Sequence, residues 1–194
     1  MRAIHRLTHA TLSLLGALGL AVAVACGGGG GGSSTPSATT LSYTDPTGVG
    51  ATEYKFVKNG SSTAQHLVLD LMGPATATTG LGVSFELASD ATKVTWTNAV
   101  IEGTTFNLGA APKLIKSKLA AANANLQAGL FQKGTASPAT INDTKALAQV
   151  SLDLKAGAAA GDVALSVVAG KAFISDATGT PSAIVVKVGA LKAQ

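Results

Sequence analysis

The sequence predicts an all-β domain, an antiparallel sandwich or barrel, and three observations support this fold class. Apolar residues alternate with polar ones in several short runs, most clearly in residues 82–87, 93–97 and 149–155. A period of two places one side of each run against a core, as in a half-buried β-strand. Glycine, proline or asparagine separates many of the runs. Many short strands divided by turn residues are typical of sandwiches and barrels.

The expected strands follow one another along the chain. The apolar positions of the three alternating runs are Val83, Phe85 and Leu87, then Val94 and Trp96, then Val150, Leu152 and Leu154. Six further segments have the composition of strands: residues 54–58, 66–71, 104–108, 163–168, 171–175 and 183–188. The Asn59-Gly60 pair is a hairpin signal, and residues 178–181 break the chain before the final strand.

Residues 112–127 depart from this pattern, and we expect them to form a short helix or helical loop inserted into the sandwich. The segment is rich in Ala, Leu and Lys, and it begins with Pro112, which suits a first helical turn. Its apolar residues at helical intervals are Ile115, Leu119, Ala122 and Leu126. This spacing predicts one helical face packed on the domain.

The N-terminus has the layout of a secretory signal peptide, which we assign to residues 1–25. Arg2 and Arg6 give a positive start, and residues 12–25 are small and apolar. A membrane-spanning helix needs roughly 20 apolar residues, and this run is shorter and opens into glycine and serine. We therefore expect the segment to be cleaved.

Cys26 is the predicted lipidation site. The residues before it, 22–25, read Val-Ala-Val-Ala and resemble the lipobox of bacterial lipoproteins, in which small residues precede the Cys that receives the lipid. Ala23 stands where that family usually has Leu. Cys26 is also the only cysteine, so an exported chain has no internal disulfide to form with it. The alternative is an alanine-type cleavage site, which would give a soluble secreted protein.

The lipobox resemblance implies a mature protein that is anchored to a membrane by lipid. Gly27, rather than Asp, follows the cysteine, which by resemblance to Gram-negative lipoproteins favours transfer to the outer membrane. Residues 26–40 are then the lipidated cysteine and a leash of Gly, Ser and Thr, a composition typical of flexible linkers. The glycine run lacks the following Lys-Ser or Lys-Thr of a phosphate-binding loop.

Residues 41–194 have the length of one ordinary domain, large enough to bury a single core. Two of the 14 basic residues are the arginines of the predicted signal, so 12 lysines face 10 acidic residues in the rest of the chain. Lys113, Lys116 and Lys118 form the only cluster, and no aromatic residues are interleaved with them. We therefore expect a solvated face here and no nucleic-acid partner.

The strand pattern resembles that of cohesin-like domains. The resemblance rests on residues 82–96, on residues 147–167 and on the closing strand 184–188. Cohesin-like domains are jelly-roll sandwiches that share their broad architecture with some carbohydrate-binding modules. The resemblance therefore implies a jelly-roll-like sandwich that docks another protein or contacts a glycan. No residue here can be matched to a dockerin-contacting position.

Catalytic and metal-binding motifs are absent from the sequence. His66 is the only histidine after residue 25, which excludes a site with several histidines. A Ser-His-Asp arrangement would have to combine His66 with Asp70, and no Gly-x-Ser-x-Gly elbow occurs. We expect His66 to face solvent or a neighbouring residue, and we expect neither an enzyme nor a cofactor.

Two functions remain open from the sequence, protein docking in the cell envelope and polysaccharide binding. Sugar-binding platforms usually combine two or three coplanar aromatic rings, and aromatic residues make up 4% of the chain. Trp96 alternates in phase with Val94, so we expect it in the core rather than on the surface. This placement favours protein docking, with polysaccharide binding as the alternative.

Overall fold

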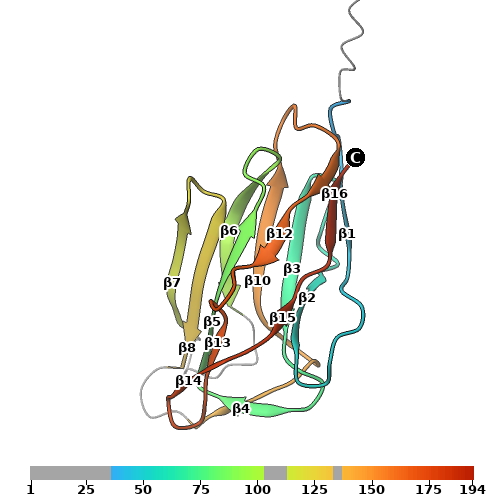
Figure 1. The fold of residues 1–194 in the computed structure, drawn as a ribbon. Coiled ribbons are helices and arrows are strands. Elements are labelled where there is room, and N and C mark those ends of the chain that lie inside the picture. Colours follow the sequence, from blue (N-terminus) through green and yellow to red (C-terminus); the bar gives the residue numbers. More distant parts are fainter. Residues whose placement is uncertain (1–35, 103–112, 133–136) are drawn as a thin grey trace, which may run out of the picture. The chain divides into compact units, whose positions relative to one another are not determined.

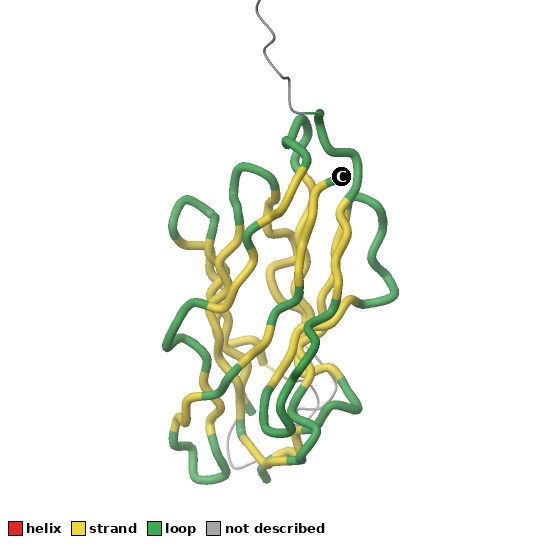
Figure 2. Tube along the Cα trace, turned by 45° about the vertical axis from the view of Figure 1, so that its right-hand side comes forward, coloured by secondary structure: helices red, strands yellow, loops and turns green. Residues whose placement is uncertain are grey.

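The computed structural model describes residues 36–102, 113–132 and 137–194, and these form β-strands, turns and loops without a helix (Figure 2). Two larger sheets face each other. The first has the order β15-β2-β3-β10-β6, formed by β2 (Tyr54–Lys58), β3 (His66–Met72), β6 (Val94–Glu102), β10 (Ala146–Leu154) and β15 (Val186–Lys187). The second has the order β14-β13-β5-β8-β7, formed by β5 (Gly82–Ser89), β7 (Lys113–Ala120), β8 (Asn125–Phe131), β13 (Phe173–Ser175) and β14 (Pro181–Ala183), with β12 (Leu165–Val167) also paired to β5.

Two smaller sheets complete the domain. A three-stranded sheet has the order β1-β16-β11, with β1 (Leu41–Thr44), β11 (Gly161–Val163) and β16 (Ala190–Ala193). The strands β4 (Thr78–Gly80) and β9 (Ala139–Ile141) pair with each other, and β4 crosses the lower end in Figure 1. The described strand pairs are antiparallel except for β15 with β2, which is parallel. The fold is therefore the predicted antiparallel sandwich.

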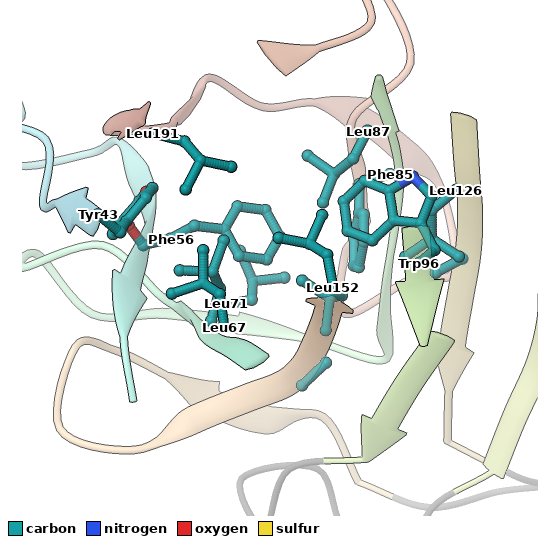
Figure 3. Packing of buried hydrophobic residues seen from close by; sticks show 14 of the residues in the cluster. Tyr43, Phe56, Leu67, Leu71, Phe85, Leu87, Trp96, Leu126, Leu152 and Leu191 are labelled. Atoms are coloured by element: carbon teal, nitrogen blue, oxygen red, sulfur yellow. The ribbon is translucent and has the colours of Figure 1, made fainter. Parts of the chain in front are cut away.

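The core lies between the two larger sheets. Phe56 of β2 and Phe85 of β5 meet edge to face, with ring centroids 5.5 Å apart and an interplanar angle of 76°. Figure 3 shows these rings among leucines of both sheets, with Trp96 at one side and Tyr43 at the other. The alternation of the sequence explains this layer, because every second residue of a strand points inward. Its largest fully buried side chains are Tyr54, Phe56, Leu67, Leu69, Leu71, Leu87, Leu126, Leu130, Ile141, Leu147, Leu152 and Val83.

The Tyr43 hydroxyl links three segments beside this core. It donates a hydrogen bond to the carbonyl oxygen of Phe56 (3.0 Å) and accepts one from the backbone amide of Gly189 (2.7 Å). Gly189 must be glycine, because a Cβ atom there would lie 1.9 Å from the carbonyl oxygen of Thr44. Burial raises the pKa of Tyr43 from 10.0 to about 12, so the hydroxyl remains a hydrogen-bond donor in mildly alkaline solution as well.

Residues 36–40, which we expected to belong to the flexible leash, are part of the domain. Ala38 is buried, and its amide donates to the carbonyl oxygen of Ala158 (2.7 Å). The amides of Thr39 and Thr40 both donate to the carbonyl oxygen of Gln194 (2.6 and 2.8 Å). The prediction of a flexible leash was wrong for these residues because backbone amides form the hydrogen bonds. Nearly every residue has a backbone amide, so the side-chain composition of the segment does not predict such bonds. The described chain thus enters the domain beside its C-terminus (Figure 1).

The helix predicted for residues 112–127 is also wrong, because the described part of this segment forms β7, a turn and the start of β8. Ala121, Ala122 and Asn123 have φ values of 48°, 54° and 69°, which no right-handed helix contains. In β8 every second residue is buried, namely Leu126, Ala128 and Leu130. The apolar residues of this part therefore also fit the period of two that is typical of a strand. Alanine favours helices only weakly, and tertiary packing overrides this preference.

Most predicted strands are confirmed, including residues 54–58, 66–71 and the three alternating runs. Two predicted strands are each divided between two sheets. Residues 163–168 contribute to β11 and β12, and residues 183–188 contribute to β14 and β15. The chain crosses from sheet to sheet inside each apolar run, which periodicity alone does not reveal. Residues 104–108 lie outside the described residues.

We predict opposite effects of removing the hydroxyl groups of two buried tyrosines. Tyr43→Phe leaves the Gly189 amide and the Phe56 carbonyl without a partner, which should lower the free energy of unfolding by about 1–3 kcal/mol. Tyr54→Phe removes a buried hydroxyl that has no hydrogen-bond partner among the described residues, so stability should be unchanged or slightly higher. Urea unfolding followed by Trp96 fluorescence measures both. Equal losses in the two variants would contradict the assigned hydrogen bonds.

Candidate functional site

The solvent-facing side of the β13-β5-β8 strands contains a shallow depression of about 350 Å³. Val83, Phe85 and Leu87 point into the core, so the alternate residues of β5 point outward. We call this surface the outer face and define it by Ser84, Glu86, Gln127, Gly129, Phe131, Lys171 and Phe173, all of which line the depression.

A carboxylate held by two amides occupies the middle of the outer face. The side-chain amide of Asn125 donates to Glu86 Oε1 (2.7 Å), and that of Gln127 donates to Glu86 Oε2 (2.9 Å). Gln127 stands directly opposite Glu86 in the β5–β8 register. Because β5 and β8 are fixed by their backbone pairing, these bonds hold the Glu86 carboxylate in one place.

Two phenylalanines stand at the edges of the depression, and small residues lie between them. Phe131 packs on a glycine, since a Cβ atom at Gly82 would lie 2.1 Å from its Cδ1 atom. Ser84 pairs with Phe173 on one side and with Gly129 on the other. Phe131 and Phe173 are both half-buried, so part of each ring faces solvent. The Phe131 ring also lies against Gly129, where a Cβ atom would be 3.1 Å from its Cε2 atom.

Positive charge borders the outer face. Lys171 is exposed and lines the depression, and Lys118 of β7 is exposed and stands opposite Gln127. Among the residues that the structure describes, neither ammonium group forms a salt bridge. The lysine cluster noted in the sequence therefore lies on an edge strand, and at Lys118 the expected solvated position is confirmed.

The outward side of the other large sheet differs, because Tyr54, Phe56 and Trp96, the aromatic residues of its strands, are buried in the core. His66 Nδ1 contacts the carboxylate of Asp153, which stands opposite it on β10. The side-chain amide of Asn59 donates to Asp70 Oδ2 (2.7 Å). His66 therefore pairs with Asp153 and not with Asp70, the partner that a catalytic arrangement would have used. No described hydroxyl is hydrogen-bonded to the His66 ring, and the expectation of a neighbouring residue is confirmed.

Trp96 is buried, as predicted, with 4% of its surface exposed. Its indole Nε1 donates to the carbonyl oxygen of Ala124 (3.1 Å), in the turn that joins β7 to β8. The indole therefore stabilises the β7–β8 hairpin from inside. It is not available as a sugar-stacking platform.

The described residues show neither a metal site nor a membrane span. No three His, Cys, Asp or Glu side chains among them lie close enough to hold a metal ion. In the same ranges, no helix has the length and apolar character needed to cross a bilayer. The predicted signal of residues 1–25 and Cys26 lie outside the described residues.

The sequence contained part of the signal for the outer face. Ser84 and Glu86 are the polar partners of an alternation that was correctly assigned to a strand. Phe131 and Gln127 were missed as surface residues, because β8 was expected to be partly helical and partly unassigned. Phe173 was placed correctly in a strand, but its outward direction depends on its register with Ser84.

Comparison with solved structures identifies the architecture. A chain of a type II cohesin–X-dockerin complex from Acetivibrio cellulolyticus has a TM-score of 0.51 and 8% identity, covering 70% of this chain and 95% of that chain. A chain of a complex of CaCohA2, a protein of Clostridium acetobutylicum, has a TM-score of 0.51 and 15% identity, with 70% and 96% covered. The domain is a cohesin-like β-sandwich.

A further similar structure is the type II cohesin dyad from the adaptor scaffoldin of Acetivibrio cellulolyticus. Its TM-score is 0.51 at 10% identity, covering 72% of this chain and 48% of that chain. No family model matches the sequence, and no curated protein matches it. The cohesin-like resemblance of the strand pattern is thus confirmed at the level of the fold.

We predict that Glu86 stabilises the sheet of this cohesin-like domain. Glu86→Ala leaves the side-chain amides of Asn125 and Gln127 without their acceptor, and the free energy of unfolding should fall by about 1–3 kcal/mol. Asp162→Ala is the control, because the Asp162 side chain is 87% exposed and its carboxylate lies 3.7 Å from the ammonium group of the exposed Lys192. Urea unfolding compares the two. A loss at Glu86 no larger than the loss at Asp162 would contradict a structural role for the Glu86 carboxylate.

Proposed function

We propose that this chain is a lipid-anchored, non-catalytic module that binds another protein through its outer face. The observation that carries the proposal is the difference between the two large sheets. Both outward sides have a depression, and the one beside His66 and Asp153 is lined by polar residues and Leu154. The depression of the outer face has two half-exposed aromatic rings instead, together with exposed ammonium groups that form no salt bridge with a described residue.

The outer face has the composition of a protein-binding surface. Aromatic side chains such as Phe131 and Phe173 are enriched in protein interfaces, where they supply much of the binding energy. The strands beneath them are held by backbone pairing, which limits the conformational entropy lost when a partner binds. The similar structures support the same function, since the Acetivibrio cellulolyticus complex pairs a cohesin with a dockerin-bearing chain.

Two observations count against other classes of function. The described residues contain no catalytic arrangement around His66, and the similar cohesins fit a non-enzyme at the level of the fold. The polysaccharide alternative loses its tryptophan, because Trp96 is buried, and the half-buried Phe131 and Phe173 are the aromatic rings left on the outer face. Protein docking therefore remains the function that the geometry supports best.

The docking prediction is tested by blocking one sheet at a time. Ser84→Arg with Gln127→Arg fills the depression of the outer face with two long side chains, and should abolish capture of a partner from the native envelope. Thr95→Arg with Gln149→Arg adds the same charge to the outward side of the other sheet, and should leave capture unchanged. Thermal unfolding checks that both variants fold. Loss of capture in the control pair alone would place the binding surface on the other sheet.

The anchor is tested at Cys26. We expect mass spectrometry of the native protein to find a mature N-terminus at Cys26 that carries acyl chains, because stable membrane attachment requires more than one. Cys26→Ser should remove the lipid and release the protein from the membrane fraction, whereas Ser33→Ala should not. An unmodified terminus at or beyond Gly27 would exclude lipid anchoring and leave the docking face unaffected.

A further inference from the structure

The exposed charged side chains at the outer face are positive. Lys118 and Lys171 are both exposed, and neither forms a salt bridge with a described residue. Glu86 is the only acidic side chain in the set that defines the outer face, and both of its oxygens accept amide hydrogen bonds. A partner that binds the outer face therefore contacts the ammonium groups of two lysines and a carboxylate that already accepts two hydrogen bonds.

The apolar part of the outer face has room for an added side chain. The depression of about 350 Å³ is lined by the small residues Gly129 and Ser84, and by Phe131 and Phe173. An aliphatic or aromatic side chain inserted there would cover the exposed parts of both rings. Such an anchor in a pocket is the usual centre of a protein interface.

We propose that the partner presents an acidic peptide segment in which Asp or Glu flanks an apolar side chain. The apolar side chain fills the depression between Phe131 and Phe173, and the carboxylates pair with Lys118 and Lys171. This inference rests on the proposed function, since it assumes that the outer face is the docking surface. Charge complementarity of this kind steers the encounter and discriminates against basic partners.

The test selects peptides from random sequences, so the partner protein need not be identified first. A random peptide library displayed on phage is panned on the full chain held in detergent. Selected peptides should be enriched in Asp or Glu next to Leu, Ile or Phe. They should bind about tenfold more weakly to the Lys118→Glu, Lys171→Glu variant, as expected for two lost ion pairs and the new repulsion. The control Lys58→Glu, Lys145→Glu changes the same net charge at exposed lysines outside the outer face, and should bind normally.

The outcomes separate this inference from the proposed function. Failure to enrich acidic peptides, or equal binding to the two charge-reversal variants, would overturn the proposed partner chemistry. If non-acidic peptides are selected and the Ser84→Arg, Gln127→Arg variant abolishes their binding, the docking face stands and only the acidic partner is wrong. Selected non-acidic peptides that bind this variant as they bind the wild type would overturn the docking face itself.

Discussion

The edge-to-face contact between Phe56 and Phe85 joins the two large sheets, and the rest of the domain depends on that layer. Each strand buries every second residue against it, so the remaining residues are left on the two outward sides. Any function of the described domain must therefore come from these outward sides, from the strand edges or from the loops. Trp96 illustrates this constraint. Its indole would suit stacking on a sugar, but it is buried in the core and does not reach the surface.

The outward sides of the two large sheets expose different kinds of side chain. On the β2-β3-β10-β6 side, Asp70 and His66 find partners within the sheet or in the loop beside it. On the β13-β5-β8 side, a single carboxylate is held by amides, while aromatic rings and ammonium groups meet solvent. A polar group that already has a partner, such as His66, gains little when another protein covers it, whereas an exposed ring gains from the burial of its apolar surface. This asymmetry supports the outer face as the docking surface.

The alternation of apolar and polar residues predicted the fold class, but it did not predict the order of the strands in the sheets. Val83, Phe85 and Leu87 revealed a strand because each of them faces the core. Residues 163–168 and 183–188 looked like single strands, since a chain that crosses between two sheets stays apolar throughout. The outer face could not be predicted from the sequence for a related reason. Phe131 and Phe173 come together through the register of β13, β5 and β8, and register depends on contacts between distant segments.

The hydrogen bonds of Ala38, Thr39 and Thr40 determine how the domain bears mechanical load. A pull on the N-terminal chain reaches these bonds to Ala158 and Gln194 first, and then β1, which is paired with β16. A pull along the axis of β1 loads the β1–β16 bonds together, in shear, instead of opening them one at a time. The Tyr43 hydroxyl also joins β1 to the carbonyl oxygen of Phe56, which lies on β2 and not in the sheet that carries the outer face. Tension would thus be resisted by the small β1-β16-β11 sheet, while the sheet that carries the outer face keeps its shape.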